Sequence, residues 1–240
     1  MFSIAVMQKI LVQYKNSSVY PKIEALFNKI SGYLSEQRAI PPIWLDNKFT
    51  FFSEPIALID DKIFSTIYKA LGENKTIKFQ YKPLTRDTFM ERKMDPYHLI
   101  CYKGNWYLMG YCHYKNEIRN FSLSRLNSVE LTDGKFKIPV DFNVNNFVDS
   151  LGVHTSKDKY NIKIKFFSEA ACYIEERIWQ KDQKITKLED GSIILEYESN
   201  QFVEIARWIL SQGKNAVVLE PIDLVDYIKK ELEATIANYR

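Results

Sequence analysis

The chain has 240 residues, a formal net charge of +3 at pH 7, and 46% hydrophobic residues. This length exceeds one average domain, so two or three units with substantial cores are expected. No apolar run approaches the roughly 20 residues of a membrane-spanning helix, so a membrane-spanning protein is not expected. The three cysteines lack paired spacing, which favours a cytoplasmic protein with reduced thiols over a disulfide-bonded secreted protein.

The first region, residues 1–72, is predicted to be mainly helical. Apolar residues recur at helical spacing in two stretches between residues 3 and 37, and Pro21 suits the first turn of the second helix. A third helix is predicted from Asp61 to Leu71, ended by Gly72.

From residue 73 to residue 142 the hydrophobic period changes to two. Ile77, Phe79 and Tyr81 alternate with polar residues, as in a half-buried strand. Asp133-Gly134 is the last clear turn signal. Closely spaced short strands joined by tight turns predict a small SH3-like or Sm-like β-barrel. The further strands are predicted near 88–94, 97–102, 105–112, 117–122 and 127–132.

Positive charge is concentrated in this strand-rich region. Residues 75–140 hold 12 Lys and Arg against 6 Asp and Glu, a balance of +6, whereas the rest of the chain holds 21 against 24, a balance of −3. Such a field attracts polyanions without specifying a ligand. The alternative is that lysines only solubilise the strand faces and protect sheet edges.

Two arginines, Arg119 and Arg125, are the main candidates for a binding site. The planar guanidinium group can hold a phosphate or carboxylate through two parallel hydrogen bonds. The two residues share a face only if their strand is regular, and a bend near Ser122 to Ser124 would reorient them. The alternative is that both arginines brace the barrel or form surface ion pairs.

Four further residues complete the predicted site. Tyr81 and His98 are expected near the arginine run, although a lone histidine is commonly structural. Tyr107 should lie on the face of its strand opposite Trp106, where it could stack on a base. The predicted ligand-binding residues are therefore Tyr81, His98, Tyr107, Arg119, Ser124 and Arg125.

Neither a metal site nor an active site is predicted. Cys112 and His113 are adjacent and point in opposite directions on a strand, and no second pair has ligand spacing. The nucleophile-elbow, phosphate-loop and zinc-protease motifs are missing from the sequence. The chain is therefore expected to be a binding protein without a cofactor, not an enzyme.

After a linker at 143–157, residues 158–240 show a different alternation. The expected order is β-α-β-β-α-β, as in the split βαβ or ferredoxin-like arrangement, with an amphipathic helix at the end. The strands are predicted at 162–166, on either side of the turn 189–192, and at 216–219, and the helices at 168–179, 201–212 and 222–239. The fold class is therefore α+β.

The strand-rich region resembles the WYL domain, which is named for the run found here as Trp106-Tyr107-Leu108. Further motifs of that family match in order: Ile77-x-Phe79-x-Tyr81, Pro96, Gly110, Arg119-x-Phe121 and Arg125-Leu126. The last region is similar to the extension that accompanies WYL domains, through Asp190-Gly191-Ser192, Trp208-Ile209-Leu210, Gly213 and Pro221. The first two helices are similar to the helical connector that precedes WYL domains.

The resemblance implies a bacterial transcriptional regulator that works as a homodimer. In this family a barrel senses a nucleotide or a single-stranded nucleic acid, the extension assists dimerisation, and a winged helix-turn-helix binds DNA. No recognition helix is apparent before Phe49, so a DNA-binding head is expected to be missing from this chain. Many relatives carry Arg and Asp where this chain has Ser122 and Ser124, so one cation of the family's pattern is absent.

Two alternative functions stay open. The first is a stand-alone accessory protein that binds RNA or single-stranded DNA without a promoter-binding head. The second is an oligomeric scaffold whose basic surface serves only for solvation. Neither is excluded by the residues themselves.

Overall fold

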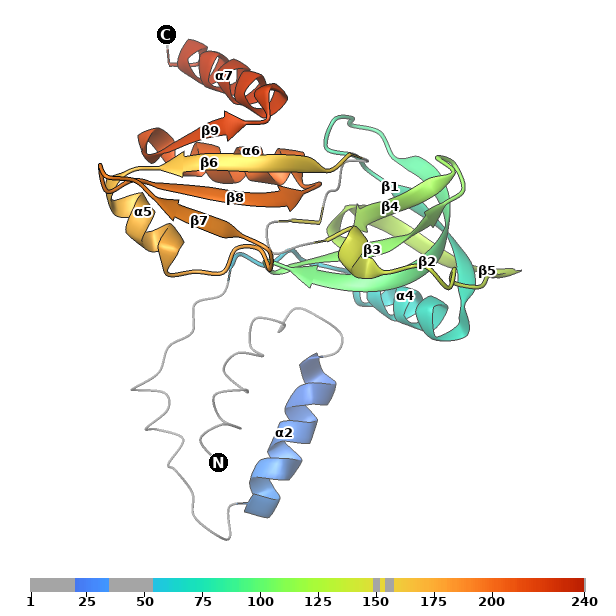
Figure 1. Ribbon diagram of the computed structural model, residues 1–240. Helices are drawn as coiled ribbons and strands as arrows, with labels where there is room; N and C mark the ends of the chain where they lie inside the picture. The colour runs from blue at the N-terminus through green and yellow to red at the C-terminus, as the bar shows by residue number, and fades with distance from the viewer. Residues whose placement is uncertain (1–19, 35–53, 149–151, 154–157, 240) are drawn as a thin grey trace. The chain divides into compact units, whose positions relative to one another are not determined.

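The computed structural model describes residues 20–34, 54–148, 152–153 and 158–239 (Figure 1). The protein is a mixed α+β structure with two antiparallel sheets. It divides into two compact units, Met1–Val140 and Asp141–Arg240, which are described separately below. Within the described ranges, no helix is both long and apolar enough to cross a membrane.

Two helices of the first unit are described. Helix α2 (Tyr20–Leu34) confirms the second predicted helix, whereas the first predicted helix lies outside the described residues. Helix α4 (Asp61–Glu73) begins where Asp60 accepts hydrogen bonds from the first free backbone N–H groups. The prediction that Gly72 ends this helix is wrong, because Asn74 adopts the left-handed conformation (φ 51°) that closes it.

The first sheet has the order β4-β3-β2-β1-β5, with every pair antiparallel. The expected closed barrel is not observed. Between the edge strands β4 and β5 the chain passes through the 3-10 turn η2 (Leu123–Arg125), and no described ladder joins those two strands. The strands are β1 (Lys75–Tyr81), β2 (Met90–Tyr102), β3 (Asn105–Cys112), β4 (Glu117–Ser122) and β5 (Leu126–Lys135).

Strand β2 is one strand of 13 residues where the sequence predicts two. It pairs with β1 as far as Met94 and with β3 from Met94 onward. Pro96 is tolerated because β1 no longer needs an N–H donor beyond Met94. Asp133-Gly134, predicted as a turn, instead lies within β5, in a bulge between the pairs formed by Lys135 and Leu131.

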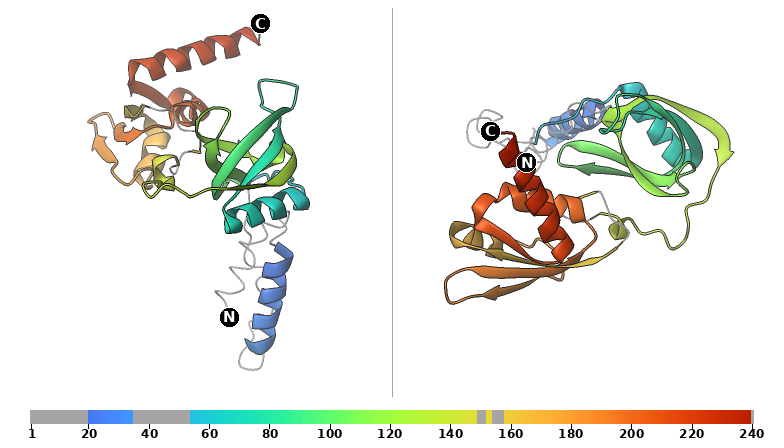
Figure 2. Two further views of the ribbon diagram at one scale, coloured as in Figure 1. Left: turned by 90° about the vertical axis from the view of Figure 1, so that its right-hand side faces the viewer. Right: turned by 90° about the horizontal axis from the view of Figure 1, so that it is seen from above.

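Helix α4 packs on this sheet through a shared hydrophobic core (Figure 2). Ile67 from the helix and Ile77 and Leu108 from the strands are fully buried. Trp106 is partly buried at the edge of this core, with its ring 5.2 Å from that of Phe64 in an edge-on contact. The tryptophan of the family motif therefore contributes to packing.

The second unit shows the predicted β-α-β-β-α-β order, and its antiparallel sheet has the order β7-β8-β6-β9. Assignment of this unit to the ferredoxin-like class stays a prediction. The predicted helix 168–179 is too long, because α5 ends at Glu175 and the backbone N–H of Trp179 donates to Gln183 Oε1 instead. The elements are β6 (Tyr160–Phe166), α5 (Ser168–Glu175), β7 (Lys184–Lys187), β8 (Ile193–Ser199), α6 (Phe202–Ser211), β9 (Ala216–Glu220) and α7 (Ile222–Ala237).

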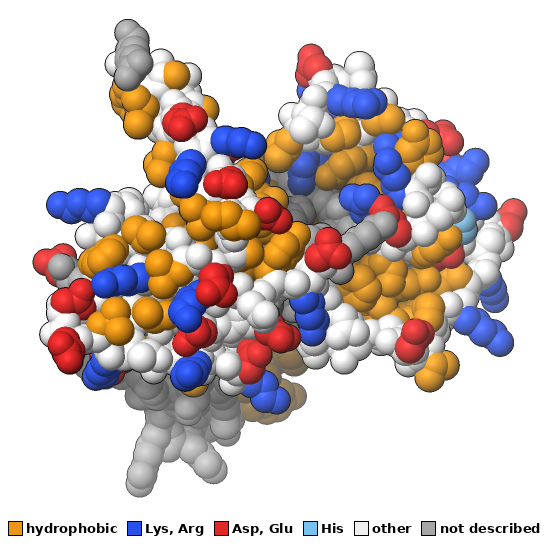
Figure 3. Space-filling model, turned by 45° about the horizontal axis from the view of Figure 1, so that its top comes forward, with side chains coloured by type: hydrophobic (Ala, Val, Ile, Leu, Met, Phe, Trp, Pro, Cys, Tyr) orange, Lys and Arg blue, Asp and Glu red, His pale blue; other side chains and the backbone are white. Residues whose placement is uncertain are grey.

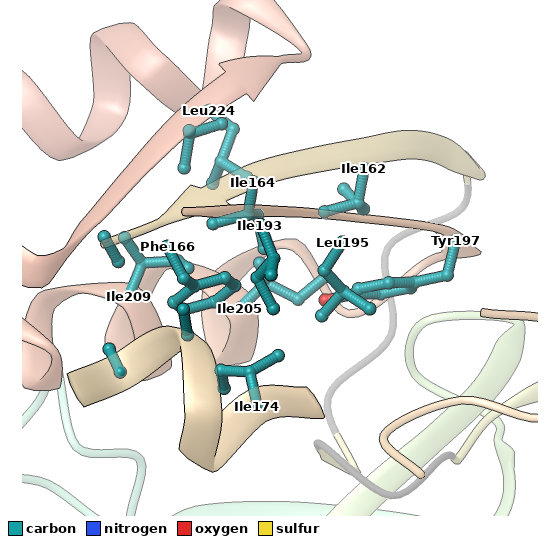
Figure 4. Packing of buried hydrophobic residues seen from close by; sticks show 14 of the residues in the cluster. Ile162, Ile164, Phe166, Ile174, Ile193, Leu195, Tyr197, Ile205, Ile209 and Leu224 are labelled. Carbon is teal, nitrogen blue, oxygen red and sulfur yellow. The ribbon is translucent and has the colours of Figure 1, made fainter. Parts of the chain in front are cut away.

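The core of the second unit lies between this sheet and its helices. Alternate residues of the two central strands point into it, among them Ile164 and Leu195, and Ile174 and Ile205 meet them from α5 and α6 (Figure 4). These four side chains are fully buried, so this unit has an apolar core of its own.

Candidate anion-binding site

A pocket of about 470 Å³ opens on the first unit, where two segments distant in sequence face each other. One segment is the loop of residues 82–89 between β1 and β2, and the other consists of residues 124–127 at the end of η2 and the start of β5. We call this the loop pocket. In the space-filling view, Lys and Arg side chains lie beside hydrophobic ones on the same unit, at the right (Figure 3).

Backbone pairing brings the two segments together. Tyr81, the last residue of β1, is opposite Leu126 in the ladder, and the N–H of Lys82 donates to the carbonyl oxygen of Arg125 at 3.0 Å. A register shift between Gln80 and Tyr81 accompanies this pairing. The start of the loop is therefore fixed against η2, and its side chains share one concave surface with Arg125.

Three cations line the loop pocket: Lys82, Arg86 and Arg125. The guanidinium carbon of Arg125 lies 5.4 Å from the ring centroid of Tyr81, which places the cation against an aromatic ring. The Lys82 ammonium group lies 2.5 Å from a carboxylate oxygen of Asp87, which is the pocket's acidic residue. The three cations and Asp87 have a summed formal charge of +2, so the pocket suits an anionic ligand.

Tyr81 is a buried support beneath Arg125. Burial raises the pKa of the Tyr81 hydroxyl above its ordinary value, and this effect outweighs the opposing charge of Arg125 and a backbone hydrogen bond at Ser122. The ring also packs edge-on against Phe121, with the centroids 4.9 Å apart. Tyr81 therefore stays a neutral phenol that positions the cation.

Two apolar side chains sit beside the cations. Leu84 is 82% exposed and Phe89 is 49% exposed, and both line the loop pocket. Exposed apolar side chains in a concave site mark a surface that contacts a ligand or partner. A ligand that carries both an anionic group and a flat or apolar group would match both parts of this lining.

The basic surface continues beyond the pocket along β2. Arg86 and Arg92 both approach the sulfur of Met90, with nitrogen–sulfur distances of 3.8 and 3.4 Å. The guanidinium group of Arg92 lies 4.3 Å from the ring centroid of Tyr114, and the Lys115 ammonium group lies 5.7 Å from the same centroid. We call Arg92, Tyr114 and Lys115 the basic extension.

Three of the six residues predicted from the sequence gather here. Ser124 and Arg125 line the loop pocket and Tyr81 supports Arg125. Tyr107 is paired with Ser122 across the ladder and lies close enough to Tyr81 to contribute to its raised pKa. The Ser124 hydroxyl lies 2.9 Å from that of Ser122, so both serines are engaged at the turn.

Arg119 and His98 lie elsewhere on the sheet. Arg119 is opposite Gly110 in β3, its side chain is 51% exposed, and it forms an ion pair with Glu117, to which its Nε donates at 2.7 Å. His98 is exposed opposite Met109. Neither residue lines the loop pocket. The bend at η2 separates the environments of the two arginines.

Sequence reasoning missed the loop, which supplies Lys82, Arg86 and Phe89. A signal was present, because two cations flank the Pro83-Leu84-Thr85 segment between two predicted strands. Basic residues in loops are usually only solvated, however, and the pairing of this loop with η2 depends on the register of β1 against β5.

Comparison with known proteins gives two family matches. The model of the WYL domain matches residues 62–131, which hold β1 to β4, the first part of β5 and the loop pocket. The model of the WCX domain matches residues 158–236 in the second unit.

Three of the curated proteins that are similar to the chain illustrate the match. PafB of Mycobacterium leprae (strain TN) is 26% identical over 188 residues, which cover 72% of this chain and 53% of that protein. YobV of Bacillus subtilis (strain 168), described as an uncharacterized HTH-type transcriptional regulator, is 28% identical over 140 residues, with 57% and 43% covered. CapW of Escherichia coli (strain KTE188), a DNA-binding transcriptional repressor, is 24% identical over 122 residues, with 47% and 40% covered. The chain thus spans about half the length of these relatives.

Proposed function

The chain carries a WYL domain followed by a WCX domain, and from this premise we propose that it is the ligand-sensing part of a transcriptional regulator. The similarity to CapW, a transcriptional repressor, and to YobV, described as a transcriptional regulator, supports a role in transcription. As in the family resemblance, the regulator would act as a homodimer in the cytoplasm. The second unit, with its β-α-β-β-α-β order of elements, would assist dimerisation.

The proposed ligand is a nucleotide or a single-stranded nucleic acid. The observation that carries this proposal is the loop pocket, in which three cations surround a concave surface that also exposes Leu84 and Phe89. Arg125 would grip a phosphate by two hydrogen bonds, and Lys82 would contribute a point charge. Tyr81 would hold Arg125 in place, and Phe89 would contact a base.

The basic extension supports a ligand longer than one nucleotide. A strand with one phosphate in the loop pocket would meet Arg92 and Tyr114 next, since Arg86 and Arg92 converge on Met90. Arg119, His98 and Tyr107 stay proposed contacts for such a longer strand. A ligand confined to the pocket would not need them.

Binding can be measured by fluorescence anisotropy of a labelled single-stranded oligothymidylate added to the full chain. We expect binding at low salt that weakens as salt rises, because phosphate contacts release counterions. Unlabelled tripolyphosphate should displace the oligonucleotide if the site recognises phosphate. An absence of binding at low salt would refute the proposed ligand class.

A regulator must also respond to its ligand. A ligand can shift the balance between two arrangements of a dimer only if it binds them with unequal affinity. Sedimentation or native mass spectrometry with and without oligothymidylate would reveal such a shift. Binding with no change in assembly would favour the alternative of a stand-alone RNA-binding or single-stranded-DNA-binding accessory protein.

A further inference from the structure

We propose that Asp87 is a built-in competitor for the anion-binding site, whose carboxylate holds Lys82 until an incoming phosphate displaces it. This inference rests on the proposed function and adds a regulating residue to the same pocket. Asp87 lines the loop pocket together with the cation that it neutralises.

The geometry of the loop places Asp87 beside Lys82 in the lining of the pocket. The Lys82 ammonium group and the Asp87 carboxylate are 2.5 Å apart although four residues lie between them, because the loop folds back on itself. A hydrogen bond from the N–H of Arg86 to the carbonyl oxygen of Pro83, at 3.3 Å, closes the turn between them. The Asp87 side chain is 96% exposed, whereas Lys82 is half-buried.

The other two cations of the pocket, Arg86 and Arg125, differ from Lys82 in their contacts. Among the residues that the structure describes, no carboxylate pairs with Arg86 or Arg125; the former approaches the Met90 sulfur and the latter the Tyr81 ring. Two cations are therefore available to a first anionic group, and the third becomes available only when Asp87 leaves. The pocket should respond most strongly to ligands with several anionic oxygens, such as a polyphosphate or a phosphodiester strand.

Displacement of Asp87 is feasible because an exposed ion pair is weak. Such pairs change an equilibrium constant by no more than about fivefold. A ligand that places two or three phosphate oxygens near Lys82 would bind Lys82 more strongly than Asp87 does, since hydrogen bonds between charged groups are among the stronger ones. The same exchange would free one end of the loop that carries Phe89, which couples occupancy to loop conformation.

The test compares the 240-residue wild-type chain with Asp87→Asn, using labelled oligothymidylate at low salt and tripolyphosphate as the competitor. The Asp87→Asn variant should bind both probes about twofold to fivefold more tightly. Asp133→Asn makes the same charge change at an exposed position in the β5 bulge and should alter affinity much less. In a Lys82→Ala background, the gain from Asp87→Asn should shrink to the level of this control.

The outcomes separate the two proposals. If Asp87→Asn binds no more tightly than wild type while Arg125→Ala still weakens binding, the competitor role is wrong and the proposed function stands. A gain that persists unchanged in the Lys82→Ala background also refutes competition for Lys82. If neither wild type nor Asp87→Asn binds either probe at low salt, the proposed ligand class fails, and this inference fails with it.

Discussion

Replacement of Arg125 by alanine removes one of the three cations that line the loop pocket. Hydrogen bonds to charged groups contribute about 1.5–3 kcal/mol each. Arg125 is only half-buried, so solvent screening reduces that figure. We therefore expect the binding free energy to fall by about 1.5 kcal/mol, which raises the Kd at low salt roughly tenfold. The loss of one phosphate contact to a single strand should also make the negative slope of log K against log salt shallower by about 0.7.

The assay is fluorescence anisotropy with labelled oligothymidylate at several salt concentrations. Arg207→Ala is the matched comparison, because it removes the same charge from the second unit at an arginine paired with Glu204 and outside the pocket lining. We expect less than about a twofold effect there, on the scale of an exposed charge. Equal losses for the two variants, or an unchanged salt slope for Arg125→Ala, would refute a site centred on the loop pocket.

Further predictions concern the scaffold. Gly110→Ala should destabilise the first unit by about 1–3 kcal/mol, because a Cβ there would lie 2.0 Å from the carbonyl oxygen of Asp95. A Cβ at Gly72 in α4 would meet no atom within 4 Å, so Gly72→Ala should leave stability unchanged or raise it. Denaturant unfolding of both variants measures the two changes in stability. Leu195→Ala should destabilise the second unit by about 2–5 kcal/mol and exposed Val217→Ala far less, and equal midpoints in urea would contradict the core assignment. The pKa of Asp190 is lowered to about 2, chiefly by hydrogen bonds from Ser192, so its stabilising contribution should be lost as pH falls from about 4 through 2. Ser192→Ala should raise that pKa in an NMR titration, and an unchanged value would disprove the assigned cause.

The strands were predictable because their residues alternate regularly. The limits of β3 and β4 follow from aromatic runs bounded by polar turns, and both match the structure. Sequence patterns failed where a long-range partner decides the outcome. Pro96 ends a strand by local rules, yet it lies within β2 because β1 stops pairing at Met94.

Closure of the barrel was a second failure of the same kind. Spacing of short strands cannot distinguish a closed barrel from an open sheet, because closure depends on pairing between the first and last edges. Here η2 occupies the chain between β4 and β5 as a turn. Local signals such as Gly72 were also overruled, since Asn74 adopts the left-handed conformation two residues later.

The candidate site was predictable only in part. Arg125 stands out by residue type and motif, but its separation from Arg119 results from the 3-10 turn between them, which a strand pattern does not reveal. The loop cations Lys82 and Arg86 join the site through the ladder between β1 and β5. Such a site is assembled by register, which no local sequence signal reports.

The most direct measurement is a backbone amide NMR titration of the full chain with tripolyphosphate. We predict saturable shifts concentrated in residues 82–89 and 124–127, which line or border the loop pocket. Their absence, or shifts centred on residues 117–119 or on the second unit, would contradict an anion-binding role for this pocket.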